Sequence, residues 1–261
     1  MKKVFGTIIA TVLMVGLMAT GALAASTDAM VRVVHASPDA PAVDVYLNDE
    51  LTIEGAEFKA ATDYLNVPEG EHKVEIFAAG TTENAVISQN VTVKAGKAYT
   101  VAAANVLENI ELVIAEDSME VTEGKTKVRV GHLSPDAPTV DVGLIDGDAL
   151  FSGAAFKAIT DYKELDPNTY DLEIRTPDGT QVLDLSGTKL EENTVYSVFA
   201  VNNAENLEVL LLKDSMLMPS EMPKTGLGGA SESSTSIVPV VASIIGLGIV
   251  GFVVFRRKIV Q

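Results

Sequence analysis

The chain of 261 residues contains no cysteine and no tryptophan, and only 5% of its residues are aromatic. Without cysteine, no disulfide, thiolate nucleophile or zinc–thiolate site can form. Because 47% of the residues are nonetheless hydrophobic, valine, leucine, isoleucine and alanine must build the core.

Basic residues are also scarce, since 19 lysines and arginines face 36 acidic residues and give a net charge of -17. Such a surface repels phosphate backbones, which excludes nucleic acid as the main partner. The chain has only three histidines and lacks a G-x-S-x-G elbow, a P-loop and an H-E-x-x-H pattern. We therefore predict a protein that is not an enzyme and that carries no cofactor.

The first residues are typical of an export signal. Lys2 and Lys3 give a positive start, and the stretch 4–18 is almost wholly apolar. We expect residues 1–24 to form a signal helix that is removed after Ala24, with a retained membrane helix as the alternative. The small residues of the expected cleavage site are Ala22, Ala24 and Ala25.

Near the other end, three features follow in strict order. A proline-containing pentapeptide lies in the expected linker 216–236 and consists of Met222, Pro223, Lys224, Thr225 and Gly226. The uncharged stretch 237–255 has 19 residues, enough for a helix that crosses a bilayer. The basic tail 256–261 would stay in the cytoplasm.

This order resembles the cell-wall sorting signal of Gram-positive surface proteins, whose pentapeptide is usually LPxTG. The resemblance implies that a sortase cuts between Thr225 and Gly226 and joins the Thr225 carboxyl to a peptidoglycan amine. Met222 departs from the pattern, although methionine is apolar and close to leucine in volume. The alternative is an ordinary single-span membrane protein that no sortase processes.

Between these ends, one segment occurs twice. "VRVVHASPDAPAVDVYL" and "VRVGHLSPDAPTVDVGL" place His35 and His132 97 residues apart, and matches such as "GAEFKAATDY" and "GAAFKAITDY" continue along most of that period. A match of this length indicates a duplicated domain. We assign residues 25–118 and 125–215 to the two copies, joined by the linker 119–124.

Within each copy, apolar residues alternate with polar ones. Val43, Val45 and Leu47, for example, alternate with Asp44 and Tyr46, which predicts strands with one face in a core. Frequent turn signals favour seven or eight short strands per copy. The predicted fold is therefore all-β: two tandem antiparallel, immunoglobulin-like β-sandwiches with limited freedom between them.

The repeated H-x-SPDAP-x-VD motif allows two interpretations. In the first, the prolines fix a turn, the carboxylates accept backbone N–H groups and the imidazole bonds a turn carbonyl. In the second, the histidine and aspartates converge on a divalent metal. We favour the structural interpretation and predict no metal. The motif residues are His35, Ser37, Pro38, Asp39, Pro41, Asp44, His132, Ser134, Pro135, Asp136, Pro138 and Asp141.

Two further tyrosines recur in the "TDY" words. Tyr64 and Tyr162 could stack on a sugar, but a structural role, in which each ring packs and each hydroxyl bonds a neighbouring loop, is the stronger expectation.

These repeated strings resemble the bacterial family labelled domain of unknown function 4397, over about residues 30–215. The family occurs in secreted and surface proteins, often in tandem, and has no assigned activity. The resemblance therefore implies fold and location but supplies no catalytic residue.

Together these features predict a non-catalytic protein of the cell wall or cell surface whose paired sandwiches bind or adhere. Its expected partners are sortase, peptidoglycan, the membrane before processing, and a surface ligand of unknown identity. The rival is a wall-embedded spacer without a specific ligand. One feature supports this rival, because only six residues separate Ser215 from Met222, a reach of about 20 Å.

Overall fold

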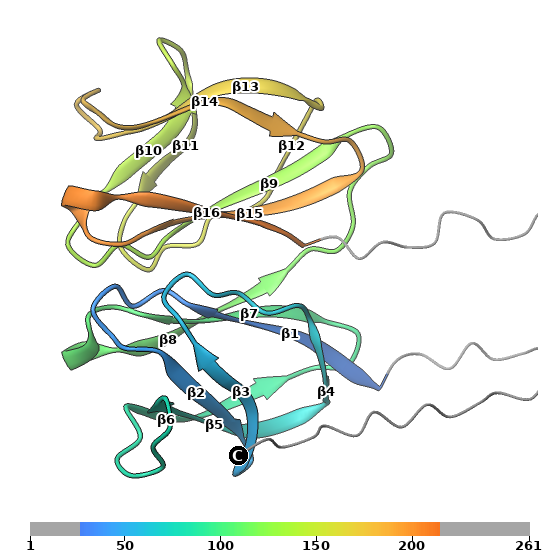
Figure 1. Cartoon of the computed structure of the whole chain (residues 1–261). Coiled ribbons are helices and arrows are strands. Elements are labelled where there is room, and N and C mark those ends of the chain that lie inside the picture. Colours follow the sequence, from blue (N-terminus) through green and yellow to red (C-terminus); the bar gives the residue numbers. More distant parts are fainter. Residues whose placement is uncertain (1–26, 215–261) are drawn as a thin grey trace, which may run out of the picture. The chain divides into compact units, whose positions relative to one another are not determined.

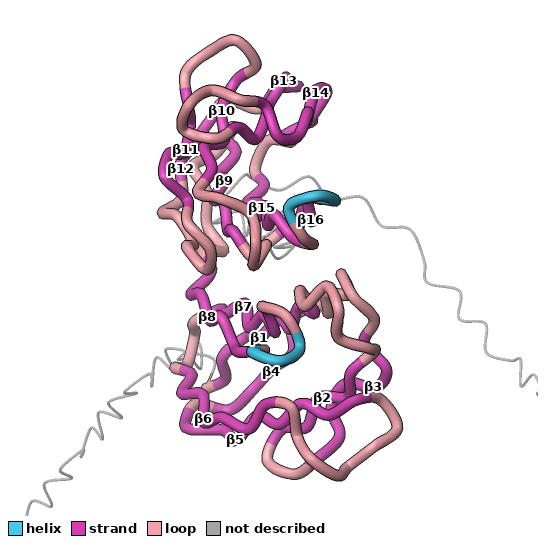
Figure 2. Tube along the Cα trace, turned by 90° about the vertical axis from the view of Figure 1, so that its left-hand side faces the viewer, coloured by secondary structure: helices cyan, strands magenta, loops and turns pink. Residues whose placement is uncertain are grey.

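The computed structural model describes residues 27–214, which are all-β apart from two short 3-10 helices (Figures 1 and 2). The expected signal helix, transmembrane helix and sorting pentapeptide lie outside the described residues. Within residues 27–214, no helix is long and apolar enough to cross a membrane.

The first copy is a sandwich of two four-stranded sheets, ordered β4-β1-β7-β8 and β3-β2-β5-β6 (Figure 1). A 3-10 helix, η1 (Leu107–Asn109), precedes its last strand. The strands are β1 (Asp28–His35), β2 (Val43–Leu47), β3 (Glu50–Ala56), β4 (Leu65–Pro68), β5 (Gly70–Ala78), β6 (Ile87–Val93), β7 (Ala98–Ala104) and β8 (Glu111–Asp117).

The second copy repeats this order with sheets β12-β9-β15-β16 and β11-β10-β13-β14. Its 3-10 helix is η2 (Ala204–Asn206). The strands are β9 (Thr126–His132), β10 (Val140–Leu144), β11 (Ala149–Ala154), β12 (Lys163–Leu165), β13 (Asn168–Arg175), β14 (Gln181–Leu190), β15 (Thr194–Val201) and β16 (Glu208–Lys213).

The sandwiches are not purely antiparallel, which corrects the sequence prediction. β1 pairs in parallel with β7, and β9 pairs in parallel with β15. A parallel pair needs a long crossover, and the five strands between β1 and β7 supply one. β1 is therefore an interior strand between β4 and β7, and each copy has eight strands, whereas an immunoglobulin constant domain has seven.

A second correction concerns the faces of the central strands, which are buried on both sides. All seven residues of β7 are buried. Tyr99 and Ala103 point into the core of the first sandwich, whereas Ala102 and Ala104 belong to a separate cluster. Period-two alternation identified the inner face, but alanine and threonine on the other face gave no clear sign of burial.

The separate cluster joins the two copies, and we call it the inter-repeat cluster. Its small members come from the first copy, and most of its bulky members come from the second. Its buried residues are Val34, Ala36, Ala102, Ala104, Leu133, Phe199 and Val201.

Matched strand pairs of the two copies fill this cluster differently. In the first copy Val34 lies beside Ala102, whereas in the second Gly131 lies beside Phe199. A Cβ atom on Gly131 would overlap the Phe199 ring and Ile159. The glycine is therefore required by the neighbouring ring.

The large residue of the pair lies on β1 in the first copy and on β15 in the second. The effects of substitutions at Gly131 and Phe199 on stability should therefore depend on each other. Gly131→Val should lower the free energy of unfolding by about 1–3 kcal/mol through overpacking. Phe199→Ala should also destabilise the protein, because it opens a cavity. The double variant recreates the Val34–Ala102 pair, so we expect urea denaturation to show a smaller loss than the sum of the single losses.

A control pairs Gly131→Val with Val91→Ala, because Val91 packs in the core of the first sandwich. These two losses should add, since the sites share no cluster. Simple additivity for the Gly131–Phe199 pair as well would contradict the proposed cause.

Candidate functional site

The repeated turn places each histidine between two backbone groups. In the first copy, His35 Nδ1 accepts a hydrogen bond from the Ser37 N–H at 3.3 Å, so Nε2 carries the proton and donates to the Pro41 carbonyl at 3.1 Å. His132 has the same partners in the second copy, the Ser134 N–H and the Pro138 carbonyl. Burial lowers the pKa of His35, which keeps its ring neutral.

The carboxylates of the first turn also accept backbone N–H groups. Asp39 Oδ1 accepts from the Leu107 N–H at 2.7 Å and so ties the turn to η1, 68 residues away, rather than forming the local turn that the sequence suggested. Asp44 accepts from the N–H groups of Gly55 and Gly80. Although it lies on a strand face expected to point outward, Asp44 is only 5% exposed.

The second copy repeats both ties. Asp136 Oδ1 accepts from the Ala204 N–H, and Asp141 Oδ1 accepts from the Gly153 N–H, each at 2.7 Å. Gly153 has φ +70°, a left-handed conformation that suits glycine. The recurring aspartates therefore align distant backbone segments in both copies.

This geometry favours the structural interpretation of the turn over the metal site. The bend carrying Pro38 and Asp39 directs its polar side chains at backbone groups, and Pro135 and Asp136 occupy the matching bend. Within residues 27–214, no group of three or more histidine or acidic side chains is placed to hold a metal ion.

A buried ionic network lies between the copies, and the sequence analysis missed it. From β1, Arg32 Nη2 donates to Asp214 Oδ1 and to Thr100 Oγ1, both at 2.7 Å. Its Nη1 donates to the Lys213 carbonyl at 3.3 Å. Arg32 is 3% exposed and Asp214 is fully buried, so water screens this pair little.

The matching arginine of the second copy bonds the first copy in the same way. From β9, Arg129 Nη2 donates to Asp117, its Nε donates to Ser197 Oγ at 2.7 Å, and its Nη1 donates to the Glu116 carbonyl at 2.9 Å. Asp117 also lies 3.8 Å from Arg32 Nη2. Two arginines and two aspartates therefore share one buried site, with each copy supplying one of each.

The recurring tyrosines complete this network. Tyr64 donates to Asp117 Oδ2 at 2.7 Å, and Tyr162 donates to Asp214 Oδ2 at 2.9 Å. Arg32 lies over the Tyr64 ring at 4.9 Å from its centroid, and Arg129 lies over Tyr162 at 4.7 Å. Burial raises the pKa of both hydroxyls above their usual range, and the adjacent carboxylates raise them further.

One signal in the sequence could have identified the network. An arginine recurs between valines in both copies, and an aspartate recurs 85 residues after it, at 117 and 214. A charge that interrupts an apolar strand at the same place twice needs a partner, because a buried unpaired charge is costly.

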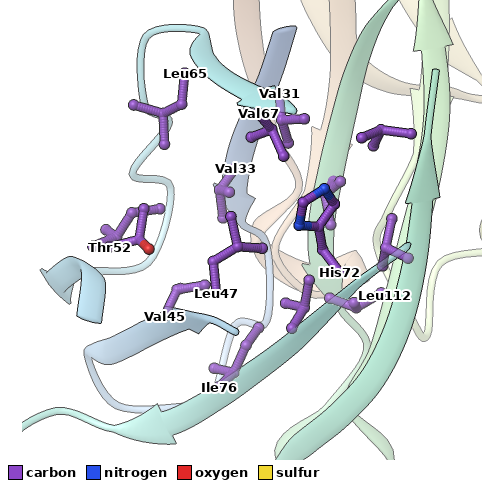
Figure 3. Close-up of a pocket in the computed structure, with 15 residues that line it drawn as sticks. Val31, Val33, Val45, Leu47, Thr52, Leu65, Val67, His72, Ile76 and Leu112 are labelled. Carbon is purple, nitrogen blue, oxygen red and sulfur yellow. The ribbon is translucent and has the colours of Figure 1, made fainter. Parts of the chain in front are cut away.

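Apolar cavities lie between the sheets of each sandwich. Figure 3 shows the one of about 50 Å³ in the first copy, lined by Val31, Leu65 and His72 among others. Both His72 ring nitrogens are already bonded, to Asn48 and to the Pro68 carbonyl. The second copy has a cavity of about 220 Å³ with a similarly apolar lining. Such linings suit apolar groups better than sugars or ions.

The ionic network predicts a large cost when one partner is removed. Arg129→Met should lower the free energy of unfolding by about 3–5 kcal/mol, because Asp117 loses its closest cation. Urea denaturation of residues 25–225 measures the loss, and Lys73→Met, which removes a partly exposed cation paired with Asp49 and Glu75, should change stability little. Equal effects of the two substitutions would contradict the assigned role.

The tyrosine hydroxyls predict a loss of stability in alkali. A hydroxyl whose pKa is raised by folding holds its proton more tightly in the folded state. Its contribution is complete below the unfolded pKa of about 10 and is lost as pH rises toward the folded value. The free energy of unfolding should therefore fall above pH 10, and it should fall less steeply in Tyr64→Phe/Tyr162→Phe.

Denaturation between pH 8 and 11 tests this slope. Carboxylate partners raise the pKa of Lys97 and Lys213, which contribute the same sign in every variant, so the comparison isolates the tyrosines. Tyr46→Phe, outside the network, is the control. An unchanged slope in the double variant would show that the two hydroxyls do not titrate on unfolding.

Comparison with known proteins gives a family and two solved structures of low similarity. The carbohydrate-binding module CBMbc (family CBM26) of Eubacterium rectale Amy13K, solved with maltoheptaose, is 13% identical, covers 70% of this chain and 95% of its own, and has a TM-score of 0.23. A candidate cell adhesion protein (BF2867) from Bacteroides fragilis NCTC 9343 is 9% identical, covers 74% of this chain and 100% of its own, and has a TM-score of 0.20.

Scores this low carry no argument about function. No curated protein matches the chain. The family model for the domain of unknown function DUF4397 matches residues 29–143 and 134–223, which together cover most of the sequence, and this chain therefore belongs to the DUF4397 family.

Proposed function

We propose that this protein is a non-catalytic, exported surface protein that sortase joins to peptidoglycan through Thr225, and that its paired sandwiches serve as one binding or adhesion module. The observation that carries the proposal is the reciprocal ionic network, because it joins the two copies through buried ion pairs. Two sandwiches joined in this way suit a module that presents one combined surface to a partner.

The polar groups that recur in the repeats are engaged in holding the fold. His35 and His132 bond backbone on both ring nitrogens, and the buried aspartates pair with arginines or with backbone. A catalytic acid or base must be able to reach a substrate, and these groups already have structural partners. Their engagement supports binding over catalysis.

The order of pentapeptide, apolar stretch and basic tail supports anchoring at the wall. The net charge of -17 supports partners that are neutral or basic over polyanions. The short reach between Ser215 and Met222 favours the second candidate, a spacer held within the wall.

Anchoring is tested by expressing the whole chain in a Gram-positive host that carries sortase. The wild-type protein should be released from walls by a muramidase, whereas Thr225→Ala should stay in the membrane fraction. Thr235→Ala, ten residues further along, is the matched control and should be processed normally. Wall linkage of Thr225→Ala would contradict the anchoring.

The same cells separate the adhesion module from the spacer. If the sandwiches are a spacer, antibody against residues 27–214 should label intact cells poorly and should label cells with digested walls strongly. Bright labelling of intact cells, together with capture of a wall polysaccharide or surface protein by residues 25–225, would support adhesion.

A further inference from the structure

Each copy offers the other the same set of charged groups. In addition to the buried pairs, Lys59 Nζ lies 2.6 Å from Glu208, and Lys157 Nζ lies 3.0 Å from Glu111. Lys59 and Lys157 occupy matching positions of the repeat, as do Glu111 and Glu208. The charged groups are therefore arranged isologously. Each copy contributes the same lysine and the same glutamate, and each binds the glutamate and the lysine of the other copy.

Charge alone would let two first copies pair with each other. Arg32 of one could bond Asp117 of the other, because Asp117 occupies the position that matches Asp214. Lys59 could likewise bond Glu111. The ionic groups do not distinguish a first copy from a second.

The apolar centre does distinguish them. Ala36 and Ala102 of the first copy match Leu133 and Phe199 of the second, and all four lie in the inter-repeat cluster. Two first copies would leave a void between alanines, and two second copies would press leucine and phenylalanine against their own counterparts. A first copy therefore fits a second copy better than either fits itself.

The segment that connects the copies is fixed to the second one. Gly124 N–H donates to Asn193 Oδ1 at 2.8 Å, and Lys127 Nζ donates to the Glu120 carbonyl at 2.6 Å. β8 ends at Asp117, just before this segment. A change of backbone direction near Ser118 would let the second copy move with its connector and keep these contacts.

Nothing in the contact requires both copies to belong to one chain. We propose that two chains exchange their second copies, so that each first sandwich pairs with the second sandwich of a second copy of this chain. The closed dimer contains two interfaces, each with the contacts of the monomer. Within one chain the two copies have a high effective concentration, which favours the monomer. The exchanged dimer therefore forms where the concentration of chains is high enough to compete.

Charge reversal tests the exchange on exposed pairs that the fold does not need. Chain one carries Glu208→Lys and Lys157→Glu, both in its second copy. Chain two carries Lys59→Glu and Glu111→Lys, both in its first copy. Each chain alone then has two repulsive contacts. Only an exchanged dimer of the two chains restores attraction at all four positions.

We expect the two chains, unfolded together in urea and refolded at high concentration, to give a 1:1 dimer of twice the monomer mass by light scattering. Its melting temperature should exceed that of either chain alone. A mixture that stays at monomer mass, with the melting curves of its separate components, would overturn the proposal. Two batches of chain one, mixed alone, are the control: any dimer they form keeps the repulsive pairs, so its melting temperature should not rise above that of the monomer.

The absence of cysteine gives a second measurement with no charge reversal. One chain carries Lys59→Cys and the other carries Glu208→Cys, and a short bis-maleimide is added after refolding together. Exchange predicts a crosslink between different chains. Lys73→Cys, whose partners Asp49 and Glu75 lie in its own copy, replaces Lys59→Cys as control and should give none. Equal crosslinking in both mixtures would indicate random collision and would overturn the exchange.

Discussion

The pairing of two arginines with two aspartates in a site closed to water is the constraint on which the rest of the structure depends. Each ion is costly to bury and is tolerated because the opposite copy supplies its partner. The two arginines point away from the core of their own sandwich, from β1 and from β9. The outer faces of the sheets β4-β1-β7-β8 and β12-β9-β15-β16 must therefore be covered by another surface. The duplicated domain provides that surface, and the chain needs no disulfide to hold it.

The repeated turn is stabilised by hydrogen bonds to the backbone and not by ion pairs, and it also uses few residue types. Two prolines remove backbone donors, and the histidine and aspartates then bond backbone groups that the strands leave without partners. Asp39 connects the turn after β1 to the 3-10 helix before β8, so one carboxylate links the segments next to the first and last strands of the first sandwich. A motif that looks like a ligand set is, in this arrangement, a set of structural ties.

The sequence predicted the all-β class and the duplicated sandwich well, because apolar residues at period two report directly on the inner face of a strand. Val43 and Val45 are buried as that pattern indicates. Parallel pairing of β1 with β7 was beyond this reasoning, since alternation does not encode which strand is the neighbour. The arginine network was also missed, because burial of Arg32 depends on Asp214, 182 residues away. Local patterns identify what a residue faces only when its partner is near in sequence.

That separation also affects the order in which the protein can fold. A ribosome delivers the amino terminus first, so β1 emerges before β7 exists to pair with it, and Arg32 emerges long before Asp214. β4 and β7 belong to the same copy and pair with β1 early. Arg32 and Val34 on the outer face of β1, however, meet their second-copy partners only after that copy has been made. A truncated product that stops before β16 would expose this surface for as long as it survived, which makes incomplete chains natural targets for chaperones and proteases.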